Sequence, residues 1–190
     1  MFERTFKDFG LPQVIRTDNG VPFATTGIHG LSQLNVWWLR LGIQHQRILP
    51  AHPEQNGAHE RMHKTLKGEA CRPPQSCLGR QQRTFNTFRR LYNDERPHEA
   101  LGGRPPGALY RPSARSYTGT LPPVEYPGHF LVKRVTNAGT IRLKKRLLFL
   151  SNALKQHPVG LEEVDDGIWS IHFCHVLLGR VDERDYVIRA

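Results

Sequence analysis

The chain is poor in cysteine and has no long apolar run, and each absence excludes a class of protein. Its 190 residues include only Cys71, Cys77 and Cys174, an odd number whose spacing suits neither a disulfide framework nor a zinc finger. No apolar stretch approaches the ~20 residues of a transmembrane helix, and the first residues do not read as a signal peptide. We therefore expect a soluble protein of a reducing compartment, the cytoplasm, with no membrane partner.

Acidic residues are scarce as well. Lys and Arg number 27 against 17 Asp and Glu, which gives a formal net charge of +10. A basic surface of this size favours a polyanionic partner, and nucleic acid is the commonest one. Because a basic protein without such a partner can have the same composition, the charge leaves both interpretations open.

The order of apolar residues predicts an α/β domain over residues 1–110. Strand and helix patterns alternate there, which is typical of α/β proteins. The expected elements are a helix over 2–9, a strand over 13–17, a helix over 31–41, a strand over 43–49, a helix that carries Glu60, and a helix around 85–92. Asn56 is expected to cap the helix of Glu60, and Gly42 to end the helix over 31–41.

Residues 111–190 have a different composition. The stretch 111–128 is rich in Pro, Ser, Gly and Tyr and has no periodicity, so we expect a linker. Short strand patterns follow, with turn signals at Asn137-Ala138-Gly139 and Asp165-Asp166-Gly167. The expected strands cover 129–135, 140–143, 147–150, 161–165 and 168–174. This pattern predicts a small antiparallel barrel or sandwich over residues 129–190.

Charge is divided unevenly within this small domain. Residues 129–160 contain seven Lys or Arg and no acid, whereas residues 161–190 contain seven acids and three Arg. We expect the basic half to form one face that binds DNA phosphates; a merely solvated surface is the alternative. The residues of this expected face are Lys133, Arg134, Arg142, Lys144, Lys145 and Arg146.

Two acids stand in distinctive settings in the α/β domain. Asp18 follows the strand over 13–17, and Glu60 starts a helix. A strand-end aspartate and a helix-borne glutamate that converge would make an oxygen-rich site for Mg²⁺ or Mn²⁺. Two such ions can stabilise the attacking and leaving oxygens of a phosphodiester displacement. An ordinary Asp-Asn-Gly turn explains Asp18 without any function, and a third carboxylate is not well placed.

The helix of Glu60 has a basic face. Four residues spaced at i, i+3, i+4 and i+7 share one side of it: Glu60, His63, Lys64 and Lys67. The acid could hold a metal ion while the lysines hold DNA phosphates, or the charges could be only a solvated face. Asn19 and Asn56 either orient the two acids or cap the backbone locally.

A rival motif overlaps the same helix. His59-Glu60-Arg61-Met62-His63 matches the H-E-x-x-H pattern, in which two histidines one turn apart bind Zn²⁺ and the glutamate is the base of a protease. Arg61 would put a charge inside a motif that normally lies on a buried helix, and His59 would fall in the first turn. Because no third ligand follows at a suitable spacing, a zinc protease is the least favoured interpretation.

Several segments together resemble the integrase core of bacterial insertion-sequence transposases, the DDE enzymes related to retroviral integrases. They are Gly10-Leu11-Pro12, Asp18-Asn19-Gly20, His52 to Gly57, Glu60-Arg61 with Lys64 to Lys67, and Tyr92 to Leu101 with Pro105-Pro106. The resemblance covers residues 2–112 closely, and its motifs are specific as a set.

The resemblance implies a fold. Residues 1–110 would form a ribonuclease-H-like α/β core, and residues 129–190 a small SH3-like β-barrel after the linker over 111–128. Family members carry their first catalytic aspartate on an upstream strand, and this sequence begins after it. We therefore expect a core that lacks its first strands and a strand over 13–17 with an unpaired edge.

The resemblance also implies a function. Asp18 corresponds to the second catalytic acid and Glu60 to the third, and both would bind Mg²⁺ or Mn²⁺, with Asn19, Asn56 and His63 in support. The implied activity is DNA transposition or integration by metal-dependent cleavage and strand transfer. Transposon ends and target DNA would be its partners, and the full-length protein would be a homo-oligomer. Without the first aspartate we expect no activity from the chain alone; the alternative is a DNA-binding remnant that performs no chemistry.

Overall fold

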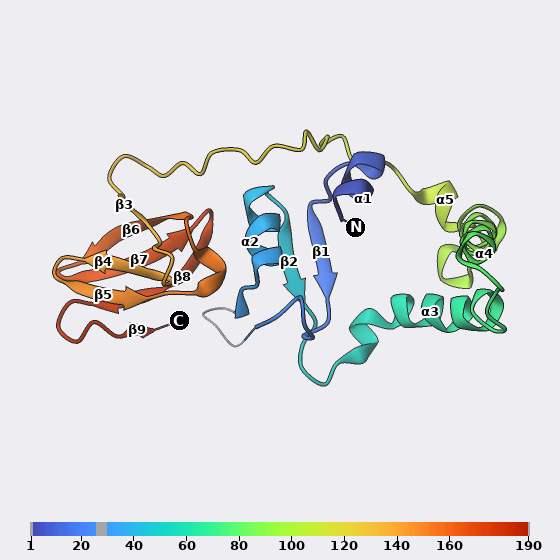
Figure 1. Ribbon diagram of the computed structural model, residues 1–190, viewed down its shortest axis with the longest axis horizontal. Helices are drawn as coiled ribbons and strands as arrows, with labels where there is room; N and C mark the ends of the chain where they lie inside the picture. The colour runs from blue at the N-terminus through green and yellow to red at the C-terminus, as the bar shows by residue number, and fades with distance from the viewer. Residues whose placement is uncertain (1, 26–29, 190) are drawn as a thin grey trace. The chain divides into compact units, whose positions relative to one another are not determined.

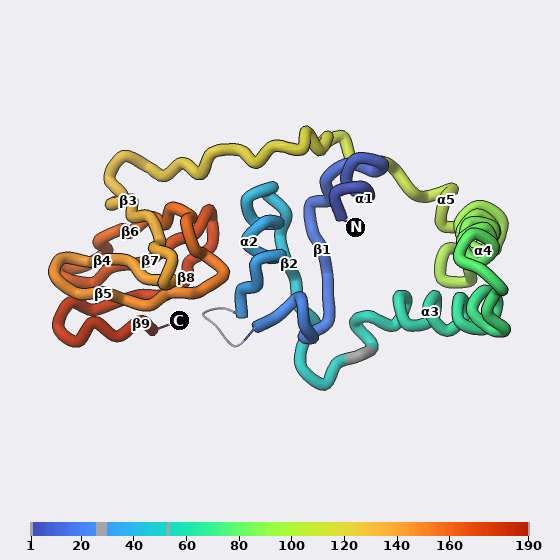
Figure 2. The backbone as a smooth tube through the Cα atoms, viewed as in Figure 1, coloured from blue at the N-terminus to red at the C-terminus, as the bar shows by residue number. Residues whose placement is uncertain are grey.

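The computed structural model describes residues 2–25 and 30–189, and the chain forms two compact units. One comprises Met1–Ile48 together with Arg115–Ala190, and the other comprises Leu49–Ala114. Figure 1 labels the helices and strands, and Figure 2 follows the backbone along the chain. Within the described residues, no helix is both long and apolar enough to cross a membrane.

The first unit begins with a small parallel sheet. Its elements are α1 (Phe2–Phe9), β1 (Val14–Thr17), α2 (Gln33–Arg40) and β2 (Gln44–Arg47). β1 and β2 pair in parallel from Val14↔Gln44 to Thr17↔Arg47, an arrangement that needs the crossover connection that α2 provides. The alternation predicted from the sequence is confirmed, with small differences at the element ends. In the part of the chain that the structure describes, β2 is the single strand beside β1.

An aromatic cluster supports this sheet. Its buried members are Phe6, Leu11, Trp38, Leu41 and Ile43. Trp38 is fully buried, and the ring of Phe2 packs edge-on against it with centroids 5.2 Å apart. Gly42 follows α2 with φ of 67°, a left-handed conformation that glycine adopts without strain. The helical spacing of Phe2 and Phe6 is therefore explained by burial of one face of α1.

The C-terminal part of the same unit is an antiparallel β domain. β3 (Leu131–Arg134), β6 (Pro158–Asp165), β7 (Ile168–Phe173), β8 (Val176–Asp182) and β9 (Ile188–Arg189) form one sheet in the order β3-β6-β7-β8-β9. β4 (Thr140–Leu143) and β5 (Arg146–Phe149) form a separate hairpin. The short 3-10 helix η5 (Asn152–Leu154) follows β5. The strand pattern of the sequence missed β8, β9 and the beginning of β6.

The strands of this domain do not close into a barrel within the described residues. The hairpin β4–β5 is a sheet of its own, and β9 pairs with β8 over only Arg180↔Arg189 and Val181↔Ile188. A barrel needs a continuous ring of paired strands, and these two places leave the ring open. The observed arrangement is a sheet and a hairpin around one core, which is closer to the predicted sandwich than to an SH3-like barrel.

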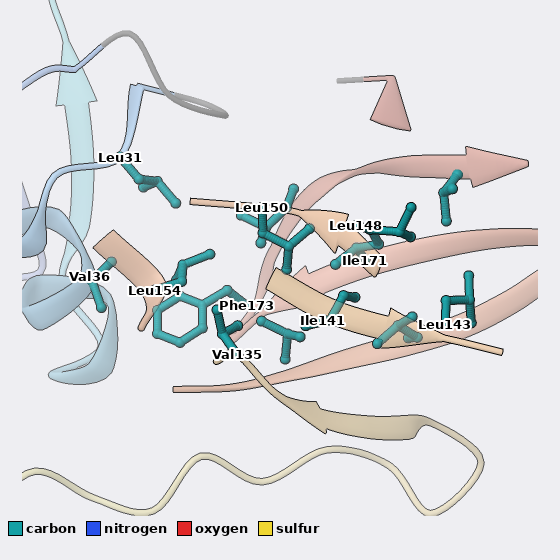
Figure 3. Packing of buried hydrophobic residues seen from close by; sticks show 14 of the residues in the cluster. Leu31, Val36, Val135, Ile141, Leu143, Leu148, Leu150, Leu154, Ile171 and Phe173 are labelled. Carbon is teal, nitrogen blue, oxygen red and sulfur yellow. The ribbon is translucent and has the colours of Figure 1, made fainter. Parts of the chain in front are cut away.

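One buried cluster, named here the β-domain cluster, fills this domain and reaches α2 (Figure 3). Its members are Leu31, Val36, Leu39, Val135, Ile141, Leu143, Leu148, Leu150, Leu154, Val159, Leu161, Ile171, Phe173, Leu178 and Val181. Val36 and Leu39 come from α2, whose Trp38 belongs to the aromatic cluster. α2 thus packs on both sides and joins the two halves of the first unit.

The predicted linker is attached to the first unit. Residues 111–128 contain no helix or strand, as their composition predicts. The carbonyl of Arg115 nevertheless accepts the N–H of Leu11 at 2.7 Å, and Arg40 donates to the carbonyl of Pro122 at 2.7 Å. Residues 115–128 therefore run along the first unit as an extended segment, named here the strap, and are not a free tether.

The second unit is a helical hairpin. η2 (Pro53–Asn56) runs directly into α3 (Gly57–Ala70), and α4 (Leu78–Arg90) follows after the connection 71–77. The π-helical turn η3 (Leu91–Glu95), the 3-10 turn η4 (Glu99–Leu101) and α5 (Pro106–Leu109) complete it. Arg96 donates to both carboxylate oxygens of Glu69 at 2.7 Å, which ties the segment after η3 to the end of α3.

Candidate functional site

Asp18 lies directly after β1, at the edge of the sheet where parallel strands end. Its Oδ1 accepts the backbone N–H of Gly20 at 2.9 Å, and its side chain is exposed. The side chain of Asn19 donates to the carbonyl of Ile48, just after β2, at 2.9 Å. Asn19 therefore ties the ends of the two strands together, which favours the local structural role over direct orientation of an acid. Ligand groups gather at this edge in open α/β sheets.

A hydrogen-bonded network that the sequence did not predict supports the backbone at Asp18. His45 Nε2 lies 2.8 Å from the hydroxyl of Thr17, and that hydroxyl donates to the carbonyl of Asp18 at 2.8 Å. On its other side His45 Nδ1 accepts from Asn35 at 3.1 Å. These bonds are consistent only with a neutral ring that carries its proton on Nε2. Burial, and then the charge of Arg47, lower the pKa of His45 below its ordinary value.

Glu60 lies in the first turn of α3, with its side chain exposed. The positive end of a helix dipole favours a carboxylate at this position. The predicted side-chain cap by Asn56 is wrong, because Asn56 makes no cap hydrogen bond. The reason is that η2 precedes α3 without a break, and its backbone already supplies a partner: the N–H of Gly57 donates to the carbonyl of Glu54.

The basic face predicted for α3 is present. Lys64 and Lys67 are exposed on the same side of the helix as Glu60. The rings of His59 and His63, one turn apart, lie in a tilted arrangement with centroids 4.2 Å apart. In the described residues, no three His, Cys, Asp or Glu side chains are grouped so as to hold a metal ion.

Asp18 and Glu60 belong to different units, so their approach to each other stays a prediction. Each is an exposed carboxylate, and Glu60 has no hydrogen-bond partner among the described residues. Carboxylate oxygens are the donors that Mg²⁺ and Mn²⁺ prefer. The chemistry of this donor pair therefore fits such an ion.

The basic residues of the β domain gather at the β4–β5 hairpin. Arg142, Lys144, Lys145 and Arg146 are all exposed. Lys144 forms an ion pair with Glu183, and the indole N–H of Trp169 donates to the same carboxylate at 2.6 Å. The hydrogen bond between Lys144 and Glu183 raises the pKa of Lys144 and lowers the pKa of Glu183.

An acidic side chain therefore lies beside one residue of the predicted basic face. Glu183 comes from the acidic half of the domain, 39 residues along the chain from Lys144, and neutralises one charge of the hairpin. Lys133 and Arg134 lie apart from the hairpin turn, on β3. Arg146 lies over the ring of Tyr186, 5.8 Å from its centroid. Arg142 and Lys145 remain without an ion pair in the described part of the domain.

Comparison with known proteins identifies a similar family over part of the chain. Residues 41–106 match the family described as the integrase core domain. The matched segment contains Glu60 and the basic face of α3, whereas Asp18 lies before it. The resemblance inferred from the motifs is confirmed for this segment, which is similar to integrase core domains.

A relative from a mobile element agrees with this class. The 39.2 kDa protein of insertion element IS476 from Xanthomonas euvesicatoria is 31% identical to this chain over 98 residues. The alignment covers 51% of this chain and 27% of that protein, so the chain matches about a quarter of the relative's length. These two matches support the resemblance of the chain to insertion-sequence transposases of the integrase type.

Proposed function

We propose that this chain serves DNA transposition or integration through metal-dependent cleavage and strand transfer. The observation that carries the proposal is the integrase-core match over residues 41–106, because it contains Glu60 together with the exposed lysines of α3. An acid beside phosphate-binding lysines suits an enzyme that acts on a DNA backbone.

Asp18 and Glu60 are the proposed metal ligands. A pair of Mg²⁺ or Mn²⁺ ions supplies charge stabilisation to the attacking and leaving oxygens of a phosphodiester. Asp18 is held for this role by the N–H of Gly20, and Asn19 fixes the turn that carries it. Lys64 and Lys67 would hold the neighbouring phosphates, with His63 beside them.

We further propose that the 190-residue chain transfers DNA strands poorly, if at all, on its own. A site of this type needs a third carboxylate, and Asp8 is the nearest acid in sequence to Asp18 that could substitute. Asp8 lies on α1, where it forms an ion pair with Arg4 at 3.8 Å. This surface pairing supports an ordinary helix residue and not a metal ligand.

A DNA-binding protein without chemistry is the second candidate. The exposed hairpin residues Arg142 and Lys145 favour it, because they can bind phosphates whether or not a metal site is complete. An assay with Mn²⁺ and DNA from the ends of the encoding element separates the two. Cleavage or joining by the chain, or by a longer chain that adds an aspartate-bearing strand, supports the enzyme, provided that Glu60→Gln abolishes it. If the chain and the longer chain both bind DNA but neither cleaves nor joins it, only the second candidate is left.

A further inference from the structure

The helix α4 has a concentration of arginine that the proposed function has not used. Between Cys71 and Asn93 the chain contains five arginines and no acid. Four of them lie on α4: Arg80, Arg83, Arg89 and Arg90. Arg90 forms an ion pair with Glu95, whereas no ion pair involves the other three in the described part of the chain.

Two of these arginines line a groove. A cavity of about 440 Å³ lies along α4 and is lined by Gln75, Arg80, Arg83, Thr84, Thr87 and Phe88 among others. Arg80 and Arg83 are one helical turn apart, so both guanidinium groups come from the same side of α4. The groove therefore presents two cations, the amide of Gln75 and the hydroxyl of Thr87, whereas the hydroxyl of Thr84 already donates to the carbonyl of Arg80 at 3.2 Å.

The charge of the groove is positive. The one carboxylate in its lining, Glu69, binds Arg96 through both oxygens at 2.7 Å. That carboxylate is thus already neutralised by an arginine from outside the groove. Arg80 donates to the hydroxyl of Ser76 at 3.1 Å, a neutral partner that positions it without cancelling its charge.

The walls of the groove are fixed without a ligand. Gln81, on the half-buried side of α4, donates to the carbonyl of Ala70 at 2.6 Å. The side-chain oxygen Oε1 of Gln81 accepts the backbone N–H of Gln75 at 3.0 Å. This single side chain fastens the connection 71–77, which carries Gln75 and Ser76, to the helix. A preformed site loses little conformational entropy on binding.

We infer that this groove binds backbone phosphates of DNA, at the opposite end of α3 from Glu60. Guanidinium groups bind phosphate through two parallel hydrogen bonds, and the hydroxyl of Thr87 and the amide of Gln75 add neutral donors beside them. The choice of DNA over another polyanion rests on the proposed function. The groove gives the second unit a DNA contact of its own, besides that of the β4–β5 hairpin.

The test uses the full chain and a fluorescent DNA duplex of arbitrary sequence, with affinity measured by anisotropy across a series of salt concentrations. Arg83→Gln removes one charge from the groove. Arg89→Gln is the matched control, because Arg89 is exposed, lies on another side of the same helix and has no ion pair in the described residues. We expect Arg83→Gln to reduce the salt slope by about 0.9, one phosphate contact, and Arg80→Gln with Arg83→Gln by about 1.8. Arg89→Gln should leave the slope unchanged.

A conservative variant separates the groove from net charge. Arg83→Lys keeps the charge but loses the planar fork, so its salt slope should stay close to that of the unchanged chain while its affinity falls. If Arg83→Gln and Arg89→Gln have equal salt slopes, the inference is overturned. This holds whether both slopes fall below that of the unchanged chain or both equal it. Thermal melts of each variant ensure that the comparison is between folded proteins.

The outcomes also distinguish this inference from the proposed function. If substitution of Lys144, Lys145 and Arg146 by Gln lowers the slope while Arg83→Gln does not, the groove is not a DNA site and DNA remains the partner. If the unchanged chain binds polyglutamate and shows no affinity for duplex DNA, both the groove assignment and DNA as the partner are wrong.

Discussion

The β domain and the α3–α4 hairpin differ in how they are stabilised. The β-domain cluster draws twelve of its fifteen buried residues from residues 131–182. Among the residues between 49 and 114 whose burial is described, the buried hydrophobic side chains are those of Ala70 and Phe88. Yet the integrase-core match and Glu60 fall on the hairpin. The part of the chain with the clearest functional signature is therefore the part least able to stabilise itself, since burial of apolar surface is the main favourable term in folding.

The largest effect is expected when one phenylalanine is replaced in the β domain and one in the α3–α4 hairpin. Phe173 is fully buried in the β-domain cluster and Phe88 is 9% exposed in the hairpin. Phe173→Ala should cost about 3–5 kcal/mol of unfolding free energy, because it removes a large side chain from a close-packed core. Phe88→Ala should cost less, because fewer buried neighbours surround it. Urea unfolding followed by circular dichroism measures both, and an equal loss would remove the contrast between the two parts.

A smaller effect is expected where the strap is fastened to the β domain. The hydroxyl of Tyr126 donates to the carbonyl of Pro158 at 3.0 Å and accepts the N–H of Cys174 at 3.2 Å. Burial raises the pKa of Tyr126 to about 12. Tyr126→Phe leaves the partners of this hydroxyl unsatisfied and should cost about 1–3 kcal/mol.

Tyr117→Phe is the matched control for this loss. The ring of Tyr117 packs edge-on against Trp37 with centroids 6.1 Å apart, and that contact survives the loss of the hydroxyl. Tyr126→Phe and Tyr117→Phe should therefore differ clearly in urea midpoint. If they do not, the strap is not held by this hydroxyl.

The smallest expected effect is a pH dependence of the first unit. The pKa values of His45 and His157 lie below the ordinary 6.5, in both cases mainly because of burial. Folding then favours the neutral rings, so stability is fully present above about pH 6.5 and falls as the pH drops through the lowered values. His45→Gln should flatten the dependence of thermal midpoint on pH, and His175→Gln, at an exposed turn, should not. A midpoint that rises on acidification would show that the sign is wrong.

Local patterns predicted the elements whose sequence signals are short-range. The strand at Val14, the helix that ends just before Gly42 and the position of Asp18 after its strand all follow from neighbouring residues. β8 was missed because Leu177, Leu178 and Gly179 do not alternate; Gly179 has φ of 151° and lies at a register shift between β7 and β8.

Long-range packing was the part that local patterns did not predict. The pairing of Lys144 with Glu183 joins two segments that look oppositely charged in the sequence. The network of His45 gives no signal beyond one histidine between two glutamines. The Asn56 cap failed because a preceding 3-10 turn, η2, took its place. Each of these depends on chain segments that meet only in the folded protein.

Mn²⁺ binding tests most directly whether Asp18 and Glu60 share a metal ion, as we propose. Titrations followed by electron paramagnetic resonance would compare the unchanged chain, Asp18→Asn, Glu60→Gln, the double variant and the control Asp8→Asn. We expect each of the two single variants to weaken Mn²⁺ binding by at least about tenfold, since even outer-shell changes at metal sites have that effect. The double variant should bind no more weakly than the worse single variant, as for residues that act on one site. A shared site would be contradicted if the loss of Mn²⁺ binding free energy in the double variant equals the sum of the two single losses. It would also be contradicted if either single variant binds Mn²⁺ as the unchanged chain does.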